Sequence, residues 1–174
     1  MDYGRTILFV PGDQPRRIRR AFDSAAESVV VDLEDAVELS AKASARESVI
    51  TALQEARHAR ALVRVNGAGT PDYRQDLRSL RPVMPLLSGI VLPKAESATQ
   101  LQKLDEDLTS LERDAAIDGG TIRVIAVLES ARGVLAAHEI ATSPRVTALM
   151  FGTLDLSAEL GVTATVAGTE LLYA

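Results

Sequence analysis

The sequence predicts an α/β fold of the TIM (β/α)8-barrel type, of which these residues supply about the first six βα units. Two observations predict it: short runs of branched apolar residues alternate with longer segments of helical periodicity, and polar or charged residues follow each apolar run. Runs rich in Val, Ile and Leu without strict alternation are typical of parallel strands buried on both faces. Such alternation of strand and helix builds either a doubly wound open sheet or a barrel.

Six segments are expected to be strands, each closed by a Gly, a Pro or an acidic cluster. They are residues 6–10, 28–33, 61–66, 89–93, 122–129 and 146–152. Four segments between them carry apolar residues at spacings of three and four, which is typical of amphipathic helices. They are residues 15–25, 40–57, 97–116 and 131–142. Ser40 and Ser97 are expected to cap two of these helices, and residues 65–72 (VNGAGTPD) to form a flexible loop.

The polar residues at the strand ends favour the barrel over the open sheet. In a barrel the carboxyl ends of all strands converge on one mouth, whereas an open sheet gathers functional residues only at its switch point. Six successive strands are followed by, or end in, such residues: Asp13; Asp32, Glu34 and Asp35; Arg64 and Asn66; Lys94 and Glu96; Glu129; and Asp155. Because eight units need about 250 residues, we expect residues 1–174 to form one incomplete barrel domain with open edges at strands one and six.

Composition excludes several classes of function. Hydrophobic residues make up 47% and charged residues 25%, as in ordinary folded domains. The net charge of −5 and the scatter of basic residues argue against nucleic acid as a partner. The absence of cysteine removes disulfides and thiolate chemistry, and no apolar run is long enough to span a membrane. A cytoplasmic location is therefore expected.

Glu129 and Asp155 are the candidate metal ligands. Two carboxylates at one barrel mouth, with water completing the coordination, suit Mg²⁺, which prefers hard oxygen ligands. The alternative is that both residues are N-caps or first-turn acids, stabilised by the dipole of the helix that follows.

Arg64 interrupts the apolar run LVRVN. A buried guanidinium group must be paired, and its planar fork suits a carboxylate or an enolate oxygen. It either binds substrate or forms an internal ion pair with Asp32, Glu34 or Asp35. Both interpretations direct it into the acidic cluster.

Three other features carry weaker signals. The basic segment RRIRR at residues 16–20 could hold a coenzyme phosphate or could be a solvated helix face with Ile18 turned inward. His58 and His138 lie in expected helices without metal-ligand spacing, and we expect them to be surface or packing residues.

Several segments in order resemble one family. They are RTILFVPGDQPRRIRRAF, VVVDLEDAV followed by Lys42 and Arg46, VRVNG, GIVLPKAE, IAVLESARGVL and ALMFGTLDLSAELG. Together they resemble the β-subunit of citrate lyase and the related malyl-CoA and citramalyl-CoA lyases of the HpcH/HpaI aldolase superfamily. The resemblance is collinear and covers nearly the whole sequence.

The resemblance implies a Mg²⁺-dependent carbon–carbon lyase on a TIM barrel. Such an enzyme cleaves or forms a 3-hydroxyacyl thioester of the citryl-, malyl- or citramalyl-CoA type, with an acetyl thioester and a 2-oxo acid as the other partners. By position, Glu129 and Asp155 match the family's metal ligands, and Glu129 also lies at the substrate. Arg64 matches its substrate-binding and catalytic arginine. Glu34 and Asp35 match the acidic pair that holds water at the metal and orients that arginine.

The resemblance also implies partners. A CoA or acyl-carrier thioester and a 2-oxo acid are the expected ligands, and a homo-oligomer, a trimer in this family, is the expected assembly. Relatives continue past the GTELLYA at residues 168–174 into further βα units and a segment that in several members donates an acidic residue to a neighbouring subunit. We expect that acid to lie outside these residues. Two other functions stay open: a catalytically silent metal- or CoA-binding scaffold, and a CoA-thioester hydrolase.

Overall fold

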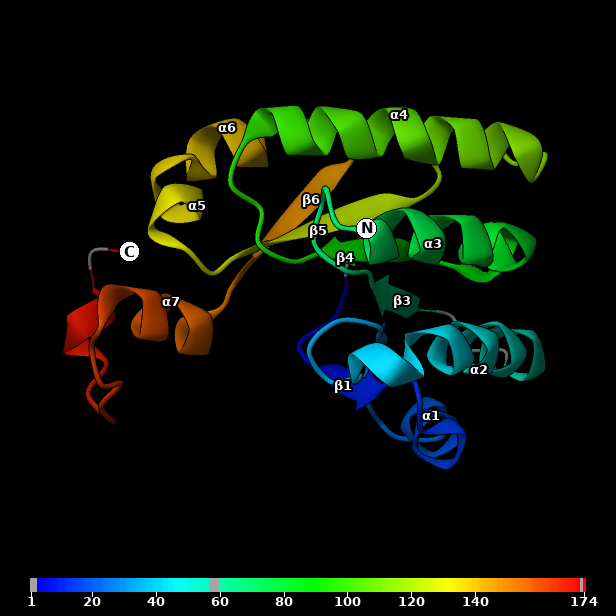
Figure 1. Ribbon diagram of the computed structural model, residues 1–174, viewed down its shortest axis with the longest axis horizontal. Coiled ribbons are helices and arrows are strands. Elements are labelled where there is room, and N and C mark those ends of the chain that lie inside the picture. Colours follow the sequence, from blue (N-terminus) through cyan, green and yellow to red (C-terminus); the bar gives the residue numbers. More distant parts are fainter. Residues whose placement is uncertain (1–2, 57–59, 173) are drawn as a thin grey trace.

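Six parallel strands form one sheet in the order β1-β2-β3-β4-β5-β6. We analysed a computed structural model, which describes residues 3–56, 60–172 and 174 (Figure 1). The strands are β1 (Ile7–Pro11), β2 (Ser28–Asp32), β3 (Ala61–Arg64), β4 (Gly89–Leu92), β5 (Arg123–Leu128) and β6 (Val146–Phe151). Because the order never reverses, the sheet has no switch point, and right-handed crossovers place all the connecting helices on one face. This is the arrangement of a barrel wall, and it confirms the predicted α/β class.

Helices follow the strands and cover that face. They are α1 (Pro15–Phe22), α2 (Lys42–Glu55), α3 (Pro71–Leu80), α4 (Ala98–Asp114), α5 (Ala131–Leu135), α6 (Ala137–Ala141) and α7 (Thr153–Leu160), with 3-10 helices at Leu39–Ala41, Arg81–Leu86 and Thr169–Leu171. Figure 1 shows α2, α3 and α4 side by side along the strands, and α7 apart from them next to α5. Within the described ranges, every helix is too short or too polar to cross a lipid bilayer.

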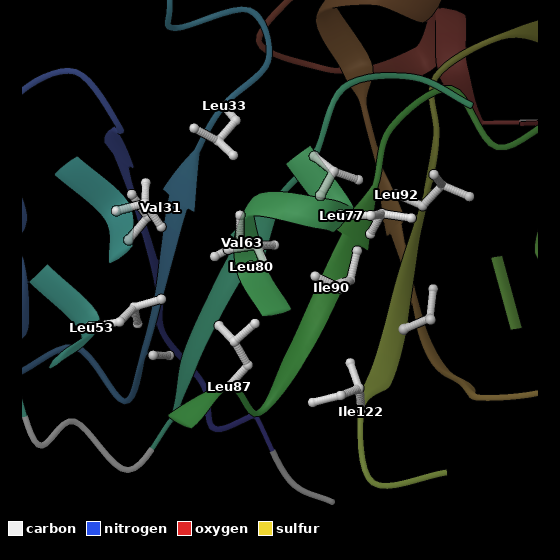
Figure 2. Close-up of a cluster of buried hydrophobic side chains, with 14 of the residues drawn as sticks. Val31, Leu33, Leu53, Val63, Leu77, Leu80, Leu87, Ile90, Leu92 and Ile122 are labelled. Carbon is white, nitrogen blue, oxygen red and sulfur yellow. The ribbon is translucent and has the colours of Figure 1, made fainter. Parts of the chain in front are cut away.

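The main hydrophobic core lies between the sheet and these helices. Figure 2 shows Val31, Val63 and Ile90 from neighbouring strands packed with Leu77 and Leu80 of α3. The other face of the sheet has its own, smaller cluster, and both faces are therefore buried. This explains why the apolar runs lack strict alternation. The smaller cluster contains Tyr3, Val30, Leu62, Val91, Ile125 and Val127.

Tyr3 joins the two ends of the sheet. Its hydroxyl group lies 2.5 Å from Thr147 Oγ1 of β6, and its carbonyl oxygen accepts a hydrogen bond of 2.6 Å from Ser28 Oγ of β2. The segment before β1 thus reaches the opposite edge strand. The sheet is therefore curved toward closure at the amino ends of its strands.

The expected open edges are present at β1 and β6. Leu8 and Phe9 of β1 are 40% and 38% exposed, and Leu149 and Phe151 of β6 are each 41% exposed. The central strands β2 and β4 are buried throughout. Large apolar side chains at both edges match the unpaired margins of a partial barrel wall.

Helix α3 is absent from the sequence prediction, which extends a flexible loop through residues 65–72. The loop in fact ends at Thr70, whose hydroxyl oxygen accepts a hydrogen bond of 3.1 Å from Tyr73 N and caps the helix. Pro71 occupies the first turn, where its fixed φ suits a helix start. The buried face of α3 contains Asp76 among its apolar residues, and this acid hides the apolar period in the sequence.

Ser97 is confirmed as a helix cap, since its Oγ accepts a hydrogen bond of 3.3 Å from Gln100 N. The prediction for Ser40 is wrong, because Ser40 lies inside a 3-10 helix and α2 begins at Lys42 without a side-chain cap. The predicted helix over residues 131–142 is two short helices that meet at Ala136. The end of the helix predicted over residues 40–57 lies outside the described residues, as does His58.

Candidate active site

The candidate site lies at the carboxyl edge of the sheet, where successive strands deliver their polar residues. Because the strands are parallel and adjacent in chain order, residues that follow them meet at one edge. The structure brings together side chains from five consecutive strand ends: Asp32, Glu34 and Asp35 after or at the end of β2; Arg64 of β3; Lys94 after β4; Glu129 after β5; and Asp155 after β6.

Arg64 is fixed mainly by Asp32. The two residues lie opposite each other in the β2–β3 register, and Arg64 Nε and Nη2 donate to the two Asp32 oxygens at 2.8 and 2.5 Å. Arg64 Nη1 lies 3.0 Å from Glu34 Oε2. The guanidinium carbon stands 5.5 Å from the centre of the Phe9 ring, a distance at which a cation is attracted to the ring face.

The guanidinium group of Arg64 stays protonated. Burial by itself disfavours the charged form, but the hydrogen bonds and charge of Asp32, together with the charge of Glu34, outweigh it and raise the pKa of Arg64 above its ordinary value. The internal ion pair predicted as one alternative is thus present. The side chain of Arg64 is nevertheless 15% exposed, so it is not sealed from solvent.

Asp32 also holds the loop that carries the next two acids. Its oxygens accept hydrogen bonds from Glu34 N at 2.8 Å and Ala36 N at 3.3 Å. Glu34 is buried and reaches both Arg64 and Lys94. Asp35 is more exposed, and its Oδ1 lies 3.7 Å from Lys94 Nζ. Of the acidic pair predicted to orient Arg64, Glu34 therefore contacts it directly, while Asp32 is its principal partner.

Lys94 lies among the carboxylates. Its Nζ is 2.5 Å from Glu34 Oε1, 3.7 Å from Asp35 Oδ1 and 4.0 Å from Asp155 Oδ2. Its backbone N–H donates to Glu129 Oε1 at 2.7 Å. Burial opposes the charge of the lysine, but the hydrogen bond and charge of Glu34 raise its pKa above the ordinary value. The sequence indicates Lys94 only as one of the polar residues at strand ends.

Glu129 is buried, and no basic side chain among the described residues forms an ion pair with its carboxyl group. Burial raises its pKa above the ordinary value, and the charges of Glu34 and Asp155 add to that rise against the opposing hydrogen bond from Lys94 N. The interpretation of Glu129 as a helix cap is wrong, because Ser130 is the N-cap of α5 and accepts a hydrogen bond of 3.1 Å from Gly133 N.

Gly152 leaves room for Glu129. A Cβ atom at this position would lie 2.6 Å from Glu129 Cβ and 2.9 Å from Glu129 Oε2, well inside van der Waals contact. Gly152 directly precedes α7, and its N–H donates to Leu128 O at 2.9 Å, which ties the end of β6 to the end of β5. The glycine of GTLDLS therefore lets two strand ends close around the carboxylate.

Asp155 lies in the first turn of α7, as one alternative predicted. Its side chain is 44% exposed and 4.0 Å from Lys94 Nζ. A first-turn acid is stabilised by the helix dipole and can still be a ligand. Its carboxylate therefore faces the same space as those of Glu34 and Glu129.

The donor chemistry of the cluster fits a hard divalent cation. Five carboxyl groups gather around two basic side chains, those of Arg64 and Lys94. In the described part of the chain, no group of three or more Asp, Glu or His side chains converges tightly enough to enclose a metal. A two-carboxylate site that leaves room for water and substrate is the kind that Mg²⁺ uses.

A second, buried polar network lies next to the site. Lys42 Nζ donates to Leu33 O at 2.6 Å, Glu34 O at 2.7 Å and Asn66 Oδ1 at 2.8 Å. Asn66 N and Nδ2 donate to Asp76 Oδ2 at 2.8 and 2.7 Å, and Asp76 Oδ1 accepts from Arg46 Nε at 2.7 Å. The network joins the ends of β2 and β3 to α2 and α3.

Sequence reasoning did not assign this network to the site. The spacing of Lys42 and Arg46, four residues apart on one helix, is the signal that could have found it, because i and i+4 share a face. Both are buried in α2, and a buried lysine requires partners.

The remaining candidates stay outside the site. Ile18 of α1 is buried, and the arginines around it are exposed, with Arg19 Nε 3.2 Å from Glu55 Oε2. This is the solvated helix face that one alternative predicted. His138 is exposed on α6.

The fold and the site define a βα-barrel protein with an acidic centre at the carboxyl ends of its strands. The chain belongs to the HpcH/HpaI aldolase/citrate lyase family, whose sequence profile matches residues 5–174. This confirms the resemblance found in the sequence.

Curated relatives differ in the activity that their names state. The chain is 37% identical over 173 residues to the citrate lyase subunit beta of Leuconostoc mesenteroides subsp. cremoris, covering 98% of this chain and 57% of that protein. It is 36% identical over 159 residues to the (3S)-malyl-CoA thioesterase of Cereibacter sphaeroides (strain KD131 / KCTC 12085), covering 90% of this chain and 51% of that protein. The chain thus spans somewhat more than half the length of these relatives.

Solved structures give the same family. The protein CitE from Mycobacterium tuberculosis in complex with magnesium and acetoacetate aligns with a TM-score of 0.76 and 32% identity, over 97% of this chain and 64% of that one. A complex of CitE with magnesium, acetoacetate and coenzyme A aligns with a TM-score of 0.70 and 33% identity, over 94% and 54% of the two chains.

Proposed function

We propose that the protein carrying this chain is a Mg²⁺-dependent carbon–carbon lyase that cleaves or forms a 3-hydroxyacyl thioester of the citryl-, malyl- or citramalyl-CoA type. The products of cleavage are an acetyl thioester and a 2-oxo acid. The observation that carries the proposal is the position of Arg64, Glu129 and Asp155 at one edge of the sheet, with an excess of carboxylates around them. The family and its magnesium-bound members support it.

Glu129 and Asp155 are the proposed ligands of the metal. When bound there, Mg²⁺ would supply a Lewis acid that polarises substrate oxygens. Glu129 is held by the backbone of Lys94, and Asp155 is held by the first turn of α7. Glu129 therefore sits on backbone at the end of β5, and Asp155 sits on a helix that packs against α5.

Arg64 is the proposed stabiliser of developing negative charge. In cleavage, the substrate hydroxyl group loses its proton, the carbon–carbon bond breaks, and its electron pair passes into a thioester enolate that then takes up a proton. A guanidinium group has five N–H donors, and the contacts with Asp32 and Glu34 involve all three nitrogens but leave one N–H on each of Nη1 and Nη2. The rest can donate to the enolate or alkoxide oxygen, and donors held in advance lower the barrier most effectively.

The test is cleavage by a Glu129→Gln variant of the full-length protein. Loss of a metal ligand should lower Mg²⁺-dependent release of 2-oxo acid from citryl-, malyl- and citramalyl-CoA by about 10²-fold or more, at least the cost of disturbing a residue that merely supports a ligand. Glu139→Gln, on the exposed surface of α6, is the matched control and should leave the rate unchanged. Unchanged cleavage in Glu129→Gln would falsify the proposal.

A CoA-thioester hydrolase is the second candidate, favoured by the malyl-CoA thioesterase relatives. The two activities are separated by their products. A lyase releases equal amounts of acetyl-CoA and 2-oxo acid, whereas a hydrolase releases free CoA and a hydroxy acid without any 2-oxo acid. Metal binding without turnover of any of these thioesters would instead identify the non-catalytic scaffold.

The partners follow from the proposed reaction. A CoA or acyl-carrier thioester and a 2-oxo acid are the proposed ligands, supported by the complexes of CitE with coenzyme A and of the Mycobacterium tuberculosis citrate lyase beta subunit with oxaloacetate. The homotrimer and the cytoplasmic location stay predictions from the family resemblance and the composition.

A further inference from the structure

Lys94 combines a fixed backbone with a side chain that can move. It follows β4 with φ of 51°, in the left-handed region that non-glycine residues seldom adopt. Its own N–H donates to Glu129 Oε1 at 2.7 Å, and the next residue, Ala95, donates to Val127 O at 3.0 Å. The strained backbone is thus held from β5, and strain of this kind concentrates at functional sites.

The ammonium group of Lys94 lies next to one carboxylate proposed for the metal site, that of Asp155, and next to two acids beside that site, Glu34 and Asp35. The Nζ atom lies 2.5 Å from Glu34 Oε1, 3.7 Å from Asp35 Oδ1 and 4.0 Å from Asp155 Oδ2, so it contacts acids that follow two strands, β2 and β6. Yet the Lys94 side chain is 47% exposed. The four-carbon stem can therefore carry the charge out toward solvent without any change in the backbone.

The other two lysines of this chain differ from Lys94 in their exposure and in their partners. Lys42 is 8% exposed, and its Nζ donates to two carbonyl oxygens and an amide oxygen, all neutral acceptors. Lys103 lies on the surface of α4 and pairs with Glu106 and Asp107 of its own helix. Of the three lysines, Lys94 alone joins a partly exposed stem to carboxylates from two strand ends, those of β2 and β6.

We propose that Lys94 is an exchangeable counter-ion of the acidic cluster, whose ammonium group competes with the divalent cation for the carboxylate of Asp155 and swings outward when that cation binds. The inference rests on the proposed metal site and adds a residue that sets its affinity. Two cations close together repel each other, and the repulsion is strong in the lower dielectric of a partly buried site.

The first test is the affinity for Mg²⁺ alone, measured by titration calorimetry on the full-length protein. Lys94→Met keeps the length of the stem and removes the charge, and it should bind Mg²⁺ about tenfold more tightly than the natural protein, because the competing positive charge is gone. Lys94→Arg keeps the charge and should bind as the natural protein does. Lys103→Met is the matched control and should leave the affinity unchanged.

The second test uses the natural protein, so the answer does not depend on how a variant folds. The lysines are acetylated briefly at constant pH, with and without saturating Mg²⁺, and each site is read by peptide mass spectrometry. Acetylation of Lys94 should rise severalfold when Mg²⁺ is present, while Lys103 stays constant and Lys42 stays low. Cleavage after glutamate places the three lysines on separate peptides, because Glu47 and Glu55 lie between Lys42 and Lys94, and Glu96 lies between Lys94 and Lys103.

The outcomes separate this inference from the function on which it rests. If the natural protein binds Mg²⁺ and Glu129→Gln does not, the metal site stands. Unchanged or weaker binding by Lys94→Met, or acetylation of Lys94 that ignores Mg²⁺, then overturns the counter-ion role alone. If neither the natural protein nor Lys94→Met binds Mg²⁺, the metal site itself is refuted, and the role of Lys94 with it.

Discussion

The register between β2 and β3 decides which acid holds Arg64. Asp32 and Arg64 are directly paired across the two strands, and neighbouring residues in such a pair have their side chains on the same face. The sequence places three acids within four positions, any of which could reach the arginine. Only the register selects Asp32, and a shift of one residue would have turned it to the other face. The partner of Arg64 was therefore left open by sequence reasoning.

Arg64→Lys tests the role of the guanidinium fork. A lysine carries one point charge and lacks the planar fork that pairs with Asp32 through two bonds and still offers donors to a substrate. We expect kcat for thioester cleavage to fall about 10²- to 10³-fold, the usual cost of losing a donor to a developing oxyanion. Steady-state kinetics on the full-length protein measures it.

The control for this substitution is Arg113→Lys, an exposed arginine on α4 whose Nη2 donates to Ser110 Oγ at 3.2 Å. Its kcat should match that of the natural protein. If Arg64→Lys also kept its rate within about twofold, charge alone would suffice and the fork would have no special role.

At the level of elements, α2 and α3 support the two strand ends that carry Glu34 and Arg64. The link is Asp76, a fully buried residue of α3 that accepts hydrogen bonds from both Arg46 and Asn66. Sequence patterns predicted α2 because its apolar residues repeat regularly. They did not predict α3, because the apolar pattern is interrupted at the position where the helix places Asp76 toward the core. A buried acid is recognisable only once its cation is known to lie beside it.

Asp76→Asn should destabilise the fold strongly. The substitution removes the charge that Arg46 needs and places amide hydrogens among donors. We expect the free energy of unfolding to fall by roughly 3 kcal/mol, as when one partner of a buried ion pair is lost. Urea denaturation followed by circular dichroism measures the change.

Glu106→Gln gives the comparison, because its exposed pair with Lys103 on α4 should contribute less than about 1 kcal/mol. Equal denaturation midpoints for the two variants would show that the buried network is not what holds α3 against the sheet.

For the whole molecule, the apolar runs predicted all six strands, and the polar residues after them predicted one edge at which the site forms. This succeeded because a parallel βα unit repeats its direction, so that strand ends coincide whatever the details of the loops. The loops themselves were less predictable. The strained turn that brings Lys94 N to Glu129, and the glycine beside that carboxylate, depend on contacts between strands distant in sequence.

The most direct test of the account is a crystal structure of the full-length protein soaked in Mn²⁺, which binds oxygen ligands as Mg²⁺ does and scatters anomalously. We expect one anomalous peak within coordination distance of a Glu129 carboxylate oxygen and an Asp155 carboxylate oxygen, roughly 2.1 Å for ligands of this kind. The peak should lie on the side of the cluster that faces Arg64. A Mn²⁺ peak bound elsewhere in the chain, with the oxygens of Glu129 and Asp155 left uncoordinated, would contradict the proposed metal site and the lyase chemistry built on it.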